Sequence, residues 1–242
     1  MKDLFGKAIL DFQTHNSPEN IITETSISDA DEMSVSYLFR DFDAMPVIEK
    51  TALLLTKGRV LDVGCGAGSH SLYLQNARKL ETCAIDISAN AIKTCQLRQI
   101  KNSYKKDIFE ITLEDCGLFD TILLLMNGTG ICGKMNRLDI FLQQLKSLLA
   151  IDGQILIDSS DIAYMFEDDE QSTQILSNTL HYYGELIFEI SYKNEKEEPF
   201  DWLFLDFTAL QKACLKNGLI CEKIIEGENH DYLARISETK KP

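Results

Sequence analysis

The stretch RVLDVGCGAGSHSLYLQ, Arg59–Gln75, decides the fold of this chain. It begins with a short apolar run, continues with a turn that has glycine at every second position from Gly64 to Gly68, and ends in a segment with helical character. Strand, glycine-rich turn and helix in this order form the first unit of α/β sheets that hold nucleotide-like ligands. The glycines alone do not specify which ligand the turn holds.

Downstream of the turn, strand-like and helix-like segments alternate up to residue 160. Strands are predicted at 59–63, 81–87, 102–108, 121–126 and 154–159, and helices after Gly68, at 89–100 and at 137–150. Regular alternation at this spacing predicts a doubly wound, mostly parallel α/β sheet with helices on both faces.

Two regions lie outside this alternation. Residues 1–57 are predicted to form a helical N-terminal lead-in around a polar middle, and residues 58–242 one domain with an inserted segment at about 161–206. The insert is predicted to contain an added hairpin, with strands at 184–192 and 200–207 joined by a charged loop. Aromatic residues of the lead-in and of this hairpin are interpreted either as a lid and wall over the ligand or as ordinary core.

The end of the chain is predicted to complete the sheet. A helix ends at Gly218, as helices often do at glycine, and strands follow at 219–225 and 231–237. A short connection between two such strands predicts a C-terminal antiparallel strand pair.

Composition restricts the class of protein. With 242 residues, 45% hydrophobic and 26% charged, the chain has the composition of a globular protein, and no apolar run approaches the ~20 residues of a membrane span. Seven cysteines without paired spacing predict reduced thiols in a cytoplasmic protein and no metal site. A formal net charge of −14 disfavours partners that bind through phosphates, so no nucleic-acid partner is predicted.

Acidic residues narrow the choice of ligand. Asp62 lies two residues before Gly64, where its carboxylate would repel a pyrophosphate but would suit an ammonium group. Position 69 is serine, whereas the dinucleotide fingerprint has glycine there. Asp86, at the end of the next strand, would accept hydrogen bonds from ribose hydroxyls, which fits nicotinamide cofactors equally well. S-adenosylmethionine carries the ammonium and ribose and has no phosphate.

On these residues the chain resembles the class I (Rossmann-like) S-adenosylmethionine-dependent methyltransferases. The resemblance covers roughly residues 45–153 and, more weakly, the last helix and strands. It implies a seven-stranded sheet that ends in an antiparallel pair. It also implies that Asp62 holds the methionine ammonium and that the backbone of Gly64, Cys65, Gly66 and Gly68 approaches the cofactor.

The resemblance also assigns the other end of the cofactor. Asp86 would bind the ribose with Ile87 beside the adenine, and Asp107 would accept from the adenine amino group while Ile108 packs on the ring. Asn127, after the fourth strand, would lie near the sulfonium together with Met126. Each of these acids and Asn127 has an alternative role as a helix-cap or turn residue.

The predicted activity is methyl transfer from S-adenosylmethionine to a small-molecule acceptor by in-line displacement. The segment MNGTG lacks the Asn-Pro-Pro-aromatic element of methyltransferases that act on DNA bases. Two alternatives stay open: a non-catalytic S-adenosylmethionine sensor or complex subunit, and a nicotinamide-dependent oxidoreductase. Catalytic residues are not predicted, because the candidate bases His70, His181 and Tyr183 have no partner that is visible in the sequence. The oligomeric state is not predicted either. No membrane association is predicted.

Overall fold

A seven-stranded sheet forms the centre of the molecule in the computed structural model, which describes residues 2–166 and 181–239. Its strand order is β11-β12-β7-β6-β3-β4-β5. The strands are β3 (Val60–Val63), β4 (Thr82–Asp86), β5 (Asn102–Lys105), β6 (Phe119–Leu124), β7 (Leu149–Ser160), β11 (Leu219–Glu226) and β12 (Asp231–Glu238). Neighbouring strands from β5 to β7 are parallel, and β12 is antiparallel to both β7 and β11. The predicted α/β fold and its C-terminal antiparallel pair are therefore confirmed.

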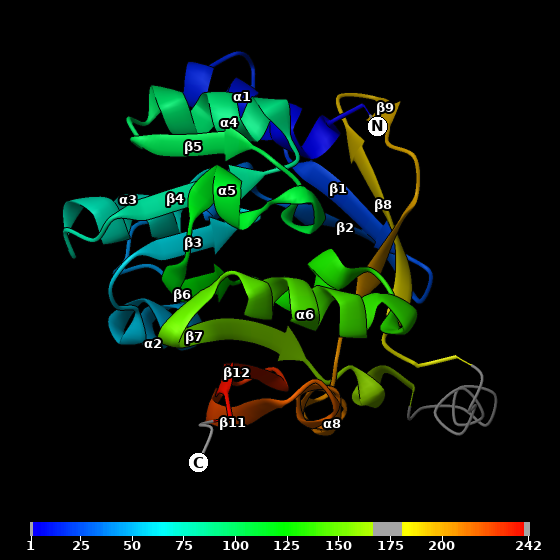
Figure 1. The fold of residues 1–242 in the computed structure, drawn as a ribbon. Helices are drawn as coiled ribbons and strands as arrows, with labels where there is room; N and C mark the ends of the chain where they lie inside the picture. The colour runs from blue at the N-terminus through cyan, green and yellow to red at the C-terminus, as the bar shows by residue number, and fades with distance from the viewer. Residues whose placement is uncertain (1, 167–180, 240–242) are drawn as a thin grey trace.

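Helices cover both faces of this sheet (Figure 1). They are α2 (Val47–Leu55), α3 (Ser69–Asn76), α4 (Ala89–Leu97), α5 (Leu113–Cys116), α6 (Leu138–Ser147) and α8 (Phe207–Lys216). Along β6, Ile122 and Leu124 pack in the core with α6 and α8, whereas Leu123 packs with α2 and α3. Successive side chains of a strand point to opposite faces, so a strand covered on both sides is apolar throughout. No helix in the described ranges has the length and hydropathy of a membrane span.

A second, five-stranded antiparallel sheet unites the two regions outside the alternation. Its order is β10-β8-β1-β2, with β9 paired to β8. The strands are β1 (Ile21–Thr25), β2 (Ser28–Met33), β8 (Glu185–Tyr192), β9 (Glu195–Lys196) and β10 (Phe200–Leu203). Helix α1 (Leu4–Thr14) and the 3-10 helix η1 (Val35–Phe39) pack on it. We call residues 4–39 and 185–203 the cap unit.

The cap unit confirms one prediction and corrects another. The added hairpin exists, since β8 pairs antiparallel with β10. The polar middle of the lead-in, however, is a hairpin of β1 and β2 and not a break between helices, so the lead-in is not mostly helical. Most residues of β2 are exposed, so the strand lacks the apolar alternation that would reveal it. Its partner β1 is held by β8, more than 150 residues away in sequence, and no local signal reports such a pairing.

Candidate active site

The predicted site residues meet where the parallel strands end, beside the cap unit. In Figure 1 the arrowheads of β3 and β7 point toward β1 and β8 of the cap unit. The glycine turn follows β3 with positive φ at Gly64 (71°), Gly66 (52°) and Gly68 (79°). A Cβ on Gly68 would lie 2.2 Å from Ile100 Cδ1, so this position has neither the backbone conformation nor the space for a side chain.

Asp86 is tied to the glycine turn. Its Oδ2 accepts from the Gly66 N–H at 2.9 Å and its Oδ1 accepts from the Ser88 N–H at 2.8 Å. Burial raises the pKa of Asp86, although these two hydrogen bonds favour the charged form. A carboxylate has about four lone-pair sites, so two acceptor positions are left for ligand hydroxyls. Asp86 therefore keeps the acceptor capacity that the predicted ribose contact requires, and the contact itself stays a prediction.

The side chain of Cys65 points away from the ligand side of the turn. Its Sγ lies 3.7 Å from the Sγ of Cys95 in α4, and Cys95 is also in contact with the Gly66 carbonyl. The hydrogen bond with the Cys95 thiol and, second, burial raise the pKa of Cys65. Only the backbone of Cys65 is therefore placed for the contact that the sequence predicted.

Asp62 is buried beneath the turn. Its Oδ2 accepts from the Ser71 hydroxyl at 2.6 Å, and the residue is 2% exposed. Burial raises the pKa of Asp62, while the charge of His70 and the Ser71 hydrogen bond oppose the increase. The predicted contact with a ligand ammonium remains a prediction, because the carboxylate already has a partner inside the protein.

A chain of buried charges leads from Asp62 to the cap unit. His70 Nε2 bonds Glu49 Oε2 at 2.5 Å, and Glu49 also forms an ion pair with Arg40. Burial lowers the pKa of His70, but the Glu49 hydrogen bond and the charge of Asp62 outweigh burial and raise it. The order Arg40, Glu49, His70, Asp62 alternates positive and negative charge, which makes the burial of each group tolerable.

This chain changes one expectation, and it also buries Arg40. The Arg40 side chain is 6% exposed, and within the described residues its Nε has no hydrogen-bond partner. His70, one of the candidate bases, already has Glu49 as its partner. Sequence reasoning missed Glu49; the only signal was an acid among the apolar residues of α2.

The residues predicted at the adenine differ in their availability. Ile87 is 52% exposed, so its apolar side chain is available for contact. Ile108 is buried in the core that packs against α6, so its side chain does not face outward. Asp107 Oδ1 accepts from the Phe109 N–H at 3.0 Å and caps the 3-10 helix η2 (Ile108–Glu110). The adenine contacts of Asp107 and Ile108 stay predictions.

The turn after β6 has an unusual backbone. Met126 (φ 68°) and Asn127 (φ 59°) are both in the left-handed region, which residues other than glycine seldom adopt. Asp158 in β7 accepts from the N–H groups of Met126 at 3.1 Å and Gly128 at 3.0 Å. Asn127 Oδ1 accepts from the Ser160 hydroxyl at 3.0 Å. Sequence reasoning found Asn127 but missed Asp158, whose signal is an acid in an apolar strand.

The cap unit lies directly on the glycine turn. Ile9 of α1 and Leu38 of η1 pack on Ala67, and Met126 borders the same cluster. The Ser69 hydroxyl donates to the Leu38 carbonyl at 2.8 Å. A ligand on this turn would be covered by the cap unit, as the lid interpretation requires; that role is still a prediction.

The other candidate bases are poorly suited to the role. The Tyr183 hydroxyl donates to Asp161 Oδ1 at 2.7 Å, and burial raises the pKa of Tyr183. His181 is exposed.

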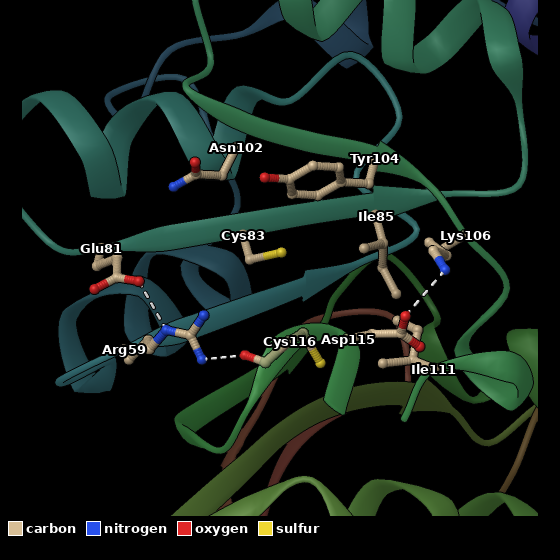
Figure 2. Close-up of a pocket in the computed structure, with 10 residues that line it drawn as sticks. All are labelled: Arg59, Glu81, Cys83, Ile85, Asn102, Tyr104, Lys106, Ile111, Asp115 and Cys116. Carbon is tan, nitrogen blue, oxygen red and sulfur yellow. Dashed lines mark hydrogen bonds and ion pairs between the residues drawn. The ribbon is translucent and has the colours of Figure 1, made fainter. Parts of the chain in front are cut away.

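A hollow of about 200 Å³ lies elsewhere, on the sheet face beside α5 (Figure 2). Helix α5 has only four residues and leaves β4 and β5 partly uncovered there. Ion pairs of Arg59 with Glu81 (2.7 Å) and of Lys106 with Asp115 (3.6 Å) occupy its rim. None of the predicted ligand-binding residues lines this hollow.

Comparison with known proteins identifies the family of the chain. A family model described as a methyltransferase domain matches residues 55–217. A solved SAM-dependent methyltransferase from Bacteroides fragilis, in complex with S-adenosyl-L-homocysteine, is 40% identical, with a TM-score of 0.89 over 99% of this chain and 96% of that chain. The sugar N-methyltransferase KedS8 from Streptoalloteichus, 14% identical with a TM-score of 0.60 over 88% of this chain and 96% of that chain, shares the fold.

The curated relatives correct the prediction about partners. Ribosomal RNA small subunit methyltransferase C from Shewanella loihica is 34% identical over 100 residues, which are 38% of this chain and 29% of that protein. The Escherichia coli protein of the same name is 37% identical over 71 residues, 28% of this chain and 21% of its own length. These relatives are named for action on a nucleic acid, so the prediction of a small-molecule substrate and no nucleic acid is wrong. A global net charge does not describe a local surface, so the value of −14 does not exclude a nucleic-acid partner.

Proposed function

This chain belongs to the S-adenosylmethionine-dependent methyltransferases, and we propose that it transfers the methyl group by in-line displacement to an acceptor held between the cap unit and the turn after β6. It uses S-adenosylmethionine as its cofactor. Membership of this family excludes the alternative of a nicotinamide-dependent oxidoreductase.

The proposal rests on Asp86, whose two oxygens are fixed by the Gly66 and Ser88 N–H groups with acceptor capacity to spare. We assign the ribose hydroxyls to these free lone pairs and the adenine to exposed Ile87. The turn from Gly64 to Gly68 allows backbone to approach the rest of the cofactor. Asp62 is assigned to the ammonium group, where its negative charge would be met by a positive one.

Bound S-adenosylmethionine supplies a methyl group that is activated by its attachment to sulfonium. The task of the protein is therefore to align the acceptor and exclude water. Ile9, Leu38 and Met126 form an apolar surface on the glycine turn that suits the exclusion of water. We assign Asn127, whose Oδ1 accepts from the Ser160 hydroxyl, to the acceptor end of the site.

For the acceptor, the names of the curated relatives provide one concrete candidate, ribosomal RNA of the small subunit. Fold alone does not assign an acceptor, and the matched relatives are covered over less than a third of their length. We therefore make this RNA the first acceptor to test.

Calorimetric titration with S-adenosylmethionine, S-adenosylhomocysteine and NADH tests the cofactor assignment. We expect binding of the first two and none of the third, and NADH binding alone would overturn the assignment. The acceptor is tested with radiolabelled S-adenosylmethionine and three samples: small ribosomal subunits, protein-free ribosomal RNA, and a cell extract filtered to remove macromolecules. Label in either RNA sample supports the RNA acceptor, and label only in the filtrate refutes it.

A further inference from the structure

The turn after β6 is held in a conformation that its own residues do not favour. Met126 and Asn127 are consecutive left-handed residues with side chains. Gly128 follows in a position where a Cβ would lie 2.5 Å from the Leu124 Cβ. Such conformations persist only where the surrounding structure enforces them, and they concentrate at functional sites.

Asp158 is the group that enforces this conformation. One oxygen accepts from the Met126 N–H and the other from the Gly128 N–H, so the carboxylate spans both ends of the left-handed pair. The next alternate residue on β7, Ser160, donates to Asn127 Oδ1 and fixes the side chain between these two anchors. Strand β7 thus holds the backbone and the side chain of the turn with two residues on the same face.

Asp158 is an unusual residue for this location. It is 8% exposed, and among residues 2–166 and 181–239 no lysine, arginine or histidine forms an ion pair with it. The titratable groups that act on it are Glu49 on α2, whose negative charge opposes ionisation, and Tyr232 on the neighbouring strand β12. Burial raises the pKa of Asp158 to about 6. A buried carboxylate without a cation is costly and requires a compensating role.

We propose that Asp158 is a positioning residue for methyl transfer: its carboxylate fixes the Met126–Gly128 turn so that Asn127 meets the acceptor in one orientation. The inference rests on the proposed function, because that function places the reacting groups at this turn. Within the described residues the Asp158 carboxylate accepts hydrogen bonds from backbone N–H groups of this turn, so its effect on the rate passes through the turn.

The test combines a kinetic and a structural measurement on Asp158→Asn, which has the same shape but replaces one acceptor oxygen by a donor. We expect S-adenosylmethionine affinity within about twofold of wild type, and a single-turnover rate lower by at least about tenfold, as expected for misaligned reacting groups. Asp120→Asn is the matched control, because Asp120 accepts from the Arg59 N–H at the opposite end of β6. The control is expected to change neither quantity. An Asp158→Asn rate equal to that of wild type would overturn the proposal.

Amide hydrogen exchange at Met126 and Gly128 separates this proposal from the proposed function. In wild type we expect both amides to be protected at pH 8 and to lose protection below about pH 6, where the carboxylate takes up a proton. In Asp158→Asn protection should be low at both values. This measurement needs no acceptor, so it tests the role of Asp158 even if none of the acceptor samples is methylated. If the variant does not fold, the wild-type pH series alone decides, and protection independent of pH between 5 and 8 would refute the role of the carboxylate.

Discussion

Relative to wild type, the free energy of unfolding of Asp158→Asn should increase progressively as pH rises. The carboxyl is neutral in the unfolded chain only below its ordinary pKa of 3.8, but in the folded protein it stays neutral up to about pH 6. A folded-state pKa above the unfolded value gives stability that is complete at low pH and is lost as pH rises through 6. Asparagine does not ionise and avoids this loss.

The size of the effect follows from the two pKa values. The shift from 3.8 to about 6 corresponds to a loss of about 3 kcal/mol at high pH, of which about 1.4 kcal/mol falls between pH 5 and pH 7.5. Because asparagine does not titrate, any other difference in stability between asparagine and the neutral carboxyl is the same at every pH. The informative quantity is therefore the slope with pH of the difference between the two proteins.

Urea unfolding of wild type and Asp158→Asn at pH 5, 6 and 7.5 measures this slope. Shared titrating groups cancel in the difference. Ser160→Ala is the control. It removes a neutral hydroxyl of β7 that donates to Asn127 in the same turn, and its stability difference from wild type should not change with pH. A flat difference for Asp158→Asn as well, within about 0.3 kcal/mol, would show that burial does not perturb the pKa of this carboxyl.

Three further predictions concern the cofactor site and the cap unit. Asp86→Ala and Asp62→Ala should each weaken S-adenosylmethionine binding by about 1.5 to 3 kcal/mol, the range for hydrogen bonds to charged groups, and calorimetry giving unchanged affinity in a folded variant contradicts the respective assignment. Glu49→Gln should lower the free energy of unfolding by about 3 to 5 kcal/mol because it breaks a buried charge chain, and a loss below about 1 kcal/mol in urea unfolding would disprove that the chain is coupled. Gly130→Ala places a Cβ 1.9 Å from the ring of Trp202, the only tryptophan in the sequence. The tryptophan fluorescence spectrum should therefore shift as the ring is displaced, and an unchanged spectrum argues against this packing.

The local part of the site could be predicted from sequence because neighbours along the chain build it. Asp62, Gly64, Gly66 and Gly68 lie within seven positions, and their strand, turn and helix follow from apolar pattern and glycine chemistry. Asp86 follows as well, since parallel strands place their carboxyl ends at one edge. The cap unit could not be predicted in the same way, because β2 is polar and β8, the other partner of β1, is remote in sequence.

By itself the sequence determined the doubly wound sheet and the cofactor, since both are encoded in contiguous residues with a recognisable period or spacing. Only the tertiary structure decided which isolated acids matter. Glu49 and Asp158 look like any other acid in the chain, and what distinguishes them is burial next to particular partners: two cations for Glu49, two backbone N–H groups for Asp158. Burial changes the energy of a charge by several kcal/mol, and it exists only once remote segments have packed together.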